Sequence, residues 1–203
     1  MGGVVSAIWR SIYGGDQECK VVIVGLSNAG KTTVLYRLNL GEFVESQPTI
    51  GSNVEEVKHK NIRFQAWDIG GGETMRGTWS SFFQDVDAVV FVVDSSDTRM
   101  IPRAKKELRL AMTSELLNGV PLLVFANKQD IRGSLTAAQI SSELDLVSYK
   151  DRDWQIQAAS AKSGAGLRDG FDWIATKIQQ RSSVAASFRS ALGVQSFTAG
   201  RNT

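Results

Sequence analysis

Residues 20–33 of the chain read KVVIVGLSNAGKTT, a short apolar run followed by a glycine-rich loop and a helical stretch. The loop itself, residues 25–32, fits the pattern G-x-x-x-x-G-K-[ST] and lies between a strand and a helix, as that pattern requires. Its glycines let backbone N–H groups turn inward around phosphate oxygens, and the N-terminus of the next helix adds a favourable dipole. These flanking elements favour a phosphate-binding loop over a chance glycine turn.

Two side chains of this loop have predicted roles at the phosphates. Lys31 can reach the β- and γ-phosphates, and the hydroxyl of Thr32 can bind Mg²⁺. The predicted phosphate contacts come from Gly25, Leu26, Ser27, Asn28, Ala29, Gly30, Lys31, Thr32 and Thr33.

Further strand patterns follow along the chain. Residues 62–67 alternate apolar and polar side chains, as a half-buried strand does. The runs 88–93 and 121–126 are continuously apolar, which is typical of strands buried on both faces. Residues 154–160 read as one more strand.

Helix patterns separate these strands. Pro102 suits the first turn of a helix that runs to about residue 117, and Thr136 with Gln139 has the spacing of a capping box. Residues 167–178 place their apolar side chains on one face of a last helix. The alternation predicts an α/β fold with a doubly wound, mostly parallel sheet and helices on both faces. In such folds ligands bind beyond the carboxyl ends of the strands.

Composition excludes several classes of protein. The chain has 203 residues, enough for one domain, and a formal charge of only +2, so no broad basic field for nucleic acid is expected. Its one cysteine, Cys19, cannot form an internal disulfide, and its apolar neighbours predict a buried, unreactive thiol. No apolar run approaches the ~18 residues of a membrane-spanning helix.

A base-reading site is predicted after the strand at 121–126, where residues 127–130 read NKQD. Asp130 can accept hydrogen bonds from guanine N1–H and the 2-amino group, and adenine lacks both donors. Asn127 can brace the loop, and the stem of Lys128 can cover the base. The later stretch Ser160, Ala161 and Lys162 offers a backbone N–H for guanine O6.

The γ-phosphate side is predicted from two further motifs. Thr49 can bind Mg²⁺ through its hydroxyl, Asp68 can hold Mg²⁺ through a water, and the Gly71 N–H can meet the γ-phosphate. Each residue alone can equally be an ordinary turn residue. The order of all four elements along the chain favours a GTP site with Mg²⁺.

With these motifs the chain resembles the Arf-like small GTPases from residue 1 to about residue 180. The resemblance rests on GLSNAGKTT, PTIGSNVEE, WDIGG, VVDSSD, NKQD and DW. The fifth Arf-like branch is the most similar, because it has SPTIGSNVEE where this chain has QPTIGSNVEE, and most Arf relatives carry an aromatic at Ser52. The resemblance implies a six-stranded Ras-like domain over residues 16–181 that exchanges GDP for GTP. It also implies exchange factors, GTPase-activating proteins and effectors, and traffic at the cytoplasmic face of Golgi (trans-Golgi) or endosomal membranes.

One catalytic position departs from the family. Relatives carry glutamine where this chain has Gly72, and that side chain orients the attacking water. Lys31 and Thr49 are kept, so the sequence predicts GTP binding with slow hydrolysis. Glu73 is one residue out of register to substitute. Ser27, where many relatives have Asp, is a second departure whose effect has no predicted sign.

Two function classes remain open from the sequence. One is a GTPase switch whose slow hydrolysis a partner stimulates. The other is a GTP-binding membrane recruiter with essentially no turnover. A phosphate-loop kinase of a small molecule is disfavoured, because NKQD reads guanine and no lid for an acceptor substrate is evident.

The amino terminus predicts membrane attachment. Its first residues, MGGVVS, match the N-myristoylation pattern with Gly2 as acceptor. Apolar side chains then recur on one helical face, so residues 1–15 are predicted to be an amphipathic helix. A helix that simply packs on the domain is the alternative. In the family this helix is released on GTP binding, when the segment corresponding to residues 51–67 shifts.

The effector surface and the tail complete the predictions. Ser52, Trp67 and Phe82 fall where relatives present a surface to effectors, although half-buried core aromatics are the alternative, and Trp79 remains undecided. Residues 182–203 are rich in Ser, Ala and Gly and are predicted to be disordered.

Overall fold

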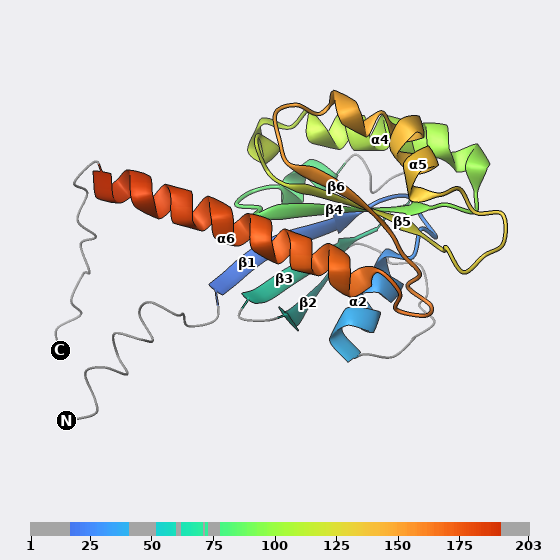
Figure 1. Cartoon of the computed structure of the whole chain (residues 1–203), viewed down its shortest axis with the longest axis horizontal. Coiled ribbons are helices and arrows are strands. Elements are labelled where there is room, and N and C mark those ends of the chain that lie inside the picture. The colour runs from blue at the N-terminus through green and yellow to red at the C-terminus, as the bar shows by residue number, and fades with distance from the viewer. Residues whose placement is uncertain (1–16, 41–51, 60–61, 71, 73–77, 192–203) are drawn as a thin grey trace.

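A computed structural model of the chain describes residues 17–40, 52–59, 62–70, 72 and 78–191. These residues form a six-stranded sheet in the order β2–β3–β1–β4–β5–β6 (Figure 1). Neighbouring strands run parallel except for the antiparallel pair β2 and β3. The strands are β1 (Gln17–Val24), β2 (Ser52–His59), β3 (Ile62–Ile69), β4 (Ala88–Asp94), β5 (Leu122–Asn127) and β6 (Trp154–Ala158).

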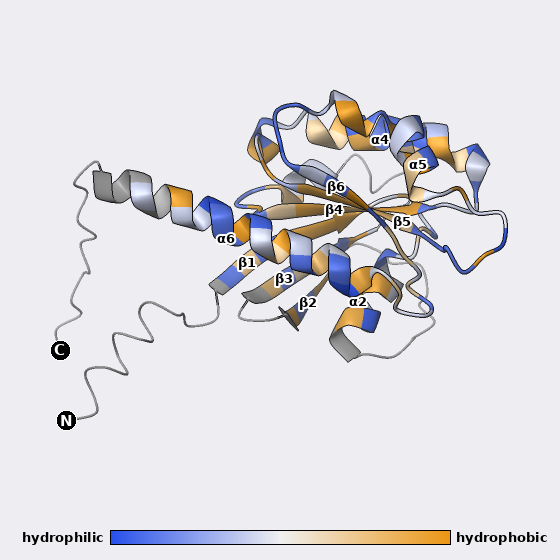
Figure 2. Ribbon diagram, viewed as in Figure 1, coloured by the Kyte–Doolittle hydropathy of each residue, from blue (hydrophilic) through white to orange (hydrophobic). Residues whose placement is uncertain are grey.

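Helices cover both faces of this sheet. The helices α4 (Ile101–Met112) and α5 (Ala137–Leu144) lie on one face, and α2 (Lys31–Leu40) and α6 (Leu167–Ala191) lie on the other (Figure 1). Successive residues of β1 alternate between the two resulting cores: Val22 belongs to the core beneath α4 and α5, and Ile23 to the core beneath α2 and α6. Hydrophobic colour is accordingly concentrated in the sheet between the helices (Figure 2). The predicted doubly wound α/β fold is confirmed.

The strands match their sequence patterns apart from their exact ends and one strand that the sequence did not predict. The continuous apolar run of β4 is buried at every residue except Asp94. The edge strand β6 ends at Ala158, two residues before the predicted end, because Ala159 and Ser160 already turn into the next loop. The sequence pattern does not predict the polar strand β2. It lies at the edge of the sheet with one partner strand, so the alternation of apolar and polar side chains along it is weak.

Helix α4 is shorter than predicted. Pro102 does lie in its first turn, but the helix ends at Met112 and not near residue 117. Ser114 adopts an extended backbone, and a separate 3₁₀ turn, η3 (Glu115–Leu117), follows it. The predicted capping box of α5 is confirmed, because Thr136 Oγ1 accepts from the Gln139 N–H and Gln139 Oε1 accepts from the Thr136 N–H.

Helix α6 corrects the prediction for the tail, since residues 182–191 are helical and not disordered. Its buried residues end at Ile178, and residues 181–184 are exposed, so local preference sustains this last part of the helix. The segment contains no Gly or Pro before residue 192, and Ser183 and Ser187 donate to carbonyls of the preceding turn. In Figure 1 the helix extends past the sheet.

Several predictions lie outside the described residues: the amino-terminal helix with Gly2, the residues Thr49, Gly71 and Glu73, and the end of the tail after residue 191. No helix among the described residues is both long enough and apolar enough to cross a membrane.

Candidate functional site

The phosphate loop connects β1 to α2 at the carboxyl edge of the sheet, and its two motif glycines are required by close contacts. A Cβ atom on Gly25, which has φ +146°, would lie 2.3 Å from the carbonyl oxygen of Val92. A Cβ atom on Gly30, with φ +94°, would lie 2.4 Å from Nδ2 of Asn127. The loop therefore lies directly against β4 and against the base-reading motif.

Lys31 is held inside this loop. Its side chain is only 6% exposed, and its Nζ donates to the carbonyl of Leu26 at 3.1 Å. Burial lowers the pKa of Lys31 to about 8, and the nearby charge of Asp68 opposes part of that shift. A buried ammonium in this loop suits an anionic ligand, whose charge would favour the protonated lysine.

Thr32 and Asp68 meet although they are 36 residues apart in sequence. The Thr32 hydroxyl, in the first turn of α2, donates to the carboxylate of Asp68, which is fully buried near the end of β3. A hydroxyl and a carboxylate oxygen side by side are donors that suit Mg²⁺, which commonly takes one or two protein oxygens and completes its shell with phosphates and water. The described residues contain no group of three or more acidic, histidine or cysteine side chains placed to hold a metal ion.

Asn127, at the end of β5, joins two loops of the site. It is 1% exposed, its Nδ2 donates to the carbonyl of Ala29 at 2.8 Å, and its Oδ1 accepts from the Ala161 N–H at 2.9 Å. One amide thus ties the phosphate loop, the end of β5 and the loop after β6 together. The predicted bracing role of Asn127 matches this geometry.

Asp130 is oriented by Ser160. The Ser160 hydroxyl donates to Asp130 Oδ1 at 2.6 Å, and Asp130 is exposed at the loop surface. A carboxylate has about four acceptor positions, so one bond from Ser160 leaves room for two N–H donors of a base. The Ala161 N–H already donates to Asn127. A backbone N–H contact to guanine O6 would therefore either share the Ala161 N–H or come from Lys162, which is exposed.

Lys128 makes a contact that the sequence did not predict. Its backbone is left-handed, with φ 66°, and its Nζ forms an ion pair with Asp94 Oδ2 at 2.7 Å. Asp94 Oδ1 accepts from the N–H and the hydroxyl of Ser96. Burial would raise the pKa of Asp94, but the bonds from Lys128 and Ser96 outweigh it and hold the pKa below its usual value. The acid that follows the continuously apolar run 88–93, in VVDSSD, is the sequence signal for this contact.

The γ-phosphate side begins at Gly70, whose carbonyl accepts from the indole N–H of Trp79 at 3.1 Å. Trp79 is 2% exposed and packs edge-on against Phe91, so it is a core residue that fixes the start of the glycine run. Gly72 is partly exposed, and no described atom lies within 4 Å of where its Cβ would be. Lack of space among the described residues therefore does not explain the missing glutamine.

The predicted effector residues are partly exposed. Ser52 is exposed at the start of β2, and the rings of Trp67 and Phe82 lie 5.8 Å apart, each half-buried against the core beneath α4 and α5. Lys20 Nζ lies 5.0 Å from the centre of the Trp67 ring. These two aromatics are neither free surface residues nor fully buried, and a role in effector binding stays a prediction.

Comparisons with known proteins agree with this geometry. Residues 5–178 match the model of the ADP-ribosylation factor family. ADP-ribosylation factor-like protein 1 of Saccharomyces cerevisiae is 46% identical over 180 residues, which are 89% of this chain and 98% of that protein. ADP-ribosylation factor-like protein 5A of Bos taurus is 46% identical over 181 residues, 89% of this chain and all of that protein. Among solved structures, the Arl6 BBS3 small GTPase from Trypanosoma brucei with bound nucleotide analogue GppNp superposes with a TM-score of 0.75 at 34% identity, over 81% of this chain and 99% of that one.

Proposed function

The chain belongs to the ADP-ribosylation factor family as an Arf-like small GTPase, and from this premise we propose that it is a guanine-nucleotide switch that recruits partners to membranes. The observation that supports this most is the Asn127 amide, which holds the phosphate loop and the two base-reading loops in one arrangement. A site assembled in this way has separate places for phosphates and for a purine base.

In the proposed complex the chain's own residues divide the ligand between them. The backbone of residues 25–33 surrounds the phosphates, with Lys31 at the β- and γ-phosphates. Thr32 and Thr49 would hold Mg²⁺ through their hydroxyls and Asp68 would hold it through a water, and the ion would neutralise phosphate charge. The oriented carboxylate of Asp130 selects guanine, and the stem of Lys128 covers the base.

Hydrolysis of GTP is proposed to be slow. Gly72 has no side chain to orient the attacking water, whereas GTP binding on this side uses the backbone of Gly71. No described atom lies within 4 Å of the Cβ position at Gly72, and a partner is proposed to supply the missing group there. The alternative, a GTP-bound recruiter with essentially no turnover, shares every other residue of the site.

The membrane part of the proposal rests on the amino-terminal pattern. Myristate on Gly2 would anchor the protein only marginally, so the amphipathic helix over residues 1–15 would supply the second attachment. Exchange factors, GTPase-activating proteins and effectors are the proposed partners, with Ser52, Trp67 and Phe82 facing effectors in vesicle traffic at Golgi or endosomal membranes. The two curated relatives are equally identical to the chain, so the assignment to the fifth branch stays a prediction.

Nucleotide competition tests the proposed ligand. Unlabelled GTP, ATP and XTP would compete with fluorescent GDP on the full chain and on Asp130→Asn. On the wild-type protein we expect only GTP, and neither ATP nor XTP, to compete well with fluorescent GDP. In the variant Ser160 can still donate to the amide oxygen. The amide N–H₂ can donate to the O2 of xanthine, but it cannot accept from guanine as the carboxylate oxygen in its place does. Guanine affinity should fall by roughly 10- to 100-fold and xanthine affinity should rise, because an unpaired polar group costs about 1–3 kcal/mol.

Two results would oppose this proposal. If ATP competes as well as GTP, the site does not read guanine and a kinase becomes the better interpretation. If Asp130→Asn leaves the ratio of guanine to xanthine affinity unchanged, Asp130 is not the residue that reads the base.

A further inference from the structure

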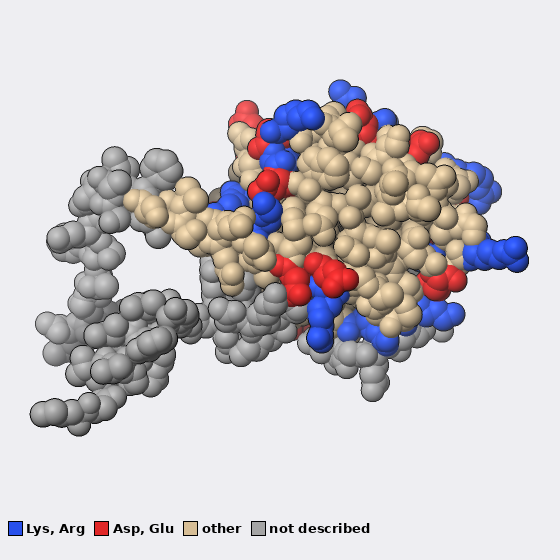
Figure 3. Space-filling view, viewed as in Figure 1, with Lys and Arg blue, Asp and Glu red and all other residues tan. Residues whose placement is uncertain are grey.

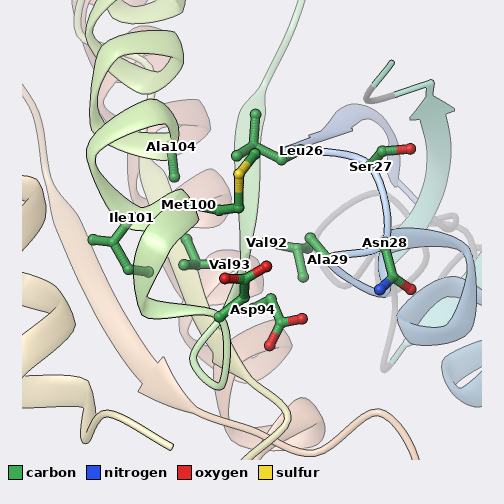
Figure 4. A pocket seen from close by; sticks show the side chains of 11 residues that line it. Leu26, Ser27, Asn28, Ala29, Val92, Val93, Asp94, Met100, Ile101 and Ala104 are labelled. Carbon is green, nitrogen blue, oxygen red and sulfur yellow. The ribbon is translucent and has the colours of Figure 1, made fainter. Parts of the chain in front are cut away.

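A pocket of about 220 Å³ lies between the phosphate loop and the start of α4 (Figure 4). Its walls come from three segments: residues 26–29 of the loop, residues 92–94 at the end of β4, and residues 97–104, which include the 3₁₀ turn η2 (Thr98–Met100). Met100 is 42% exposed and Ser27 is exposed, so the pocket opens at the protein surface.

The pocket is apolar at one end and acidic at the other. Leu26, Met100 and Ala104 lie together at one end in Figure 4, and the carboxylate of Asp94 lies at the opposite end. Asp97 also lines the pocket. A group that fills both ends therefore needs an apolar stem and a positively charged tip.

The acidic end has capacity for another cation. Asp94 already accepts from Lys128 and Ser96, but a carboxylate offers about four acceptor positions. The other carboxylate, of Asp97, is 3.5 Å from Nε of Arg99, whose side chain is 91% exposed. An ion pair this long and this exposed contributes little, so Asp97 can exchange its partner.

The size of the pocket limits its occupant. Sites for complete small-molecule ligands usually begin at about 300 Å³, so this pocket fits a group of the size of one side chain. Lysine combines an apolar four-carbon stem with a compact ammonium. We propose that the pocket accepts a lysine side chain of a protein partner, with its ammonium between Asp94 and Asp97.

Occupation of the pocket would act on nucleotide release. The ion pair to Asp94 fixes Lys128, whose stem lies in the base-reading motif. A second ammonium on Asp94 repels Lys128 and weakens that fixation, so a bound lysine speeds the release of guanine nucleotide. This consequence rests on the proposed function, whereas binding of lysine to the pocket does not.

Binding is tested first on the GDP-loaded full chain by amide chemical shifts. The probe is N-acetyl-lysine amide, and its neutral isostere is N-acetyl-norleucine amide. We expect the lysine probe to shift the signals of Leu26, Val93 and Ala104 with a millimolar dissociation constant, and to leave Ile174 on α6 unchanged. Equal shifts from the norleucine probe would overturn the recognition of charge. Tighter binding of n-butylamine than of the capped lysine would overturn the assignment to a protein side chain.

A variant pair tests the acidic end. Asp97→Asn should weaken binding of the lysine probe by about threefold or more, the size expected for one partly exposed charge partner. Glu143→Gln removes the same charge from an exposed position on α5 and should leave binding unchanged. Equal effects from both variants would overturn the site. The comparison of lysine with norleucine needs no variant, so the test survives a variant that fails to fold.

Release of fluorescent GDP is then measured at increasing probe concentration. Saturating lysine probe should speed release by about twofold or more, with its half-maximal concentration equal to the dissociation constant from the shifts. Binding without faster release would overturn the coupling to Lys128 and leave guanine binding untouched. Loss of guanine selectivity in the competition assay would instead count against the proposed function.

Discussion

Replacement of Asn127 by alanine is the change that should disturb the site most through the structure alone. The amide makes two bonds inside the protein, to the carbonyl of Ala29 and from the N–H of Ala161, and it is 1% exposed. Alanine makes neither bond, so a backbone acceptor and a backbone donor lose their partner in the interior.

The magnitude follows from these two groups. Each polar group that loses its partner in the interior costs about 1–3 kcal/mol, and neighbouring losses are not additive, so we expect about 2–4 kcal/mol in total. If the loss falls mainly on the nucleotide complex, it corresponds to roughly 30- to 1,000-fold weaker binding of GDP. A part that falls on the protein itself would lower the midpoint of thermal unfolding.

Two measurements on one preparation separate these contributions: equilibrium titration with fluorescent GDP, and thermal unfolding with and without GDP. Asn118→Ala is the matched control, because Asn118 is exposed after η3 and precedes the amino end of β5, whereas Asn127 ends that strand at the site. If Asn127→Ala binds GDP within about threefold of the wild type and unfolds at the same temperature, the two hydrogen bonds of Asn127 do not stabilise the site and the prediction is wrong.

The other predictions concern packing and titration. Gly30→Ala should weaken GDP binding and destabilise the fold by more than Gly119→Ala, because both have positive φ but only Gly30 would place its Cβ 2.4 Å from a described side-chain atom; comparison of their unfolding midpoints checks this. Cys19 should resist alkylation in the native protein even at pH 10, because burial, with a smaller effect from Asp87, raises its pKa to about 12. The unfolded thiol loses its proton at lower pH, so the free energy of unfolding should fall as pH rises from about 9 towards 12, and urea unfolding at several pH values measures this. Rapid labelling of the native protein would show that Cys19 is accessible.

Sequence patterns were sufficient for the parts of the site that are contiguous in the chain. The phosphate loop and the NKQD motif carry their own spacing, and continuous apolar runs identify β4 and β5 as buried strands. These local signals also fix the order of the elements, and hence which loops share the carboxyl edge of the sheet.

Long-range contacts could not be read in the same way. The Asn127 amide reaches a carbonyl 98 residues earlier, and Lys128 pairs with Asp94 on the neighbouring strand. Nothing in the spacing of Trp79 distinguishes a core residue from a surface aromatic, and only its bond to Gly70 and its burial decide. The composition of residues 182–203 predicts disorder, but residues 182–191 contain no Gly or Pro and continue α6.

We propose that the missing side chain at Gly72 makes this protein a slow GTPase. Single-turnover hydrolysis of preloaded GTP tests it on the full chain, on Gly72→Gln and on Gly72→Ala. No described atom lies within 4 Å of the Cβ position, and a GTP titration of each protein controls for binding. We predict equal affinities and a rate that rises only in Gly72→Gln, by up to about 10², the lower range for one positioned polar group. A wild type that already hydrolyses GTP as fast as Gly72→Gln, or an equal gain in Gly72→Ala, would contradict the claim.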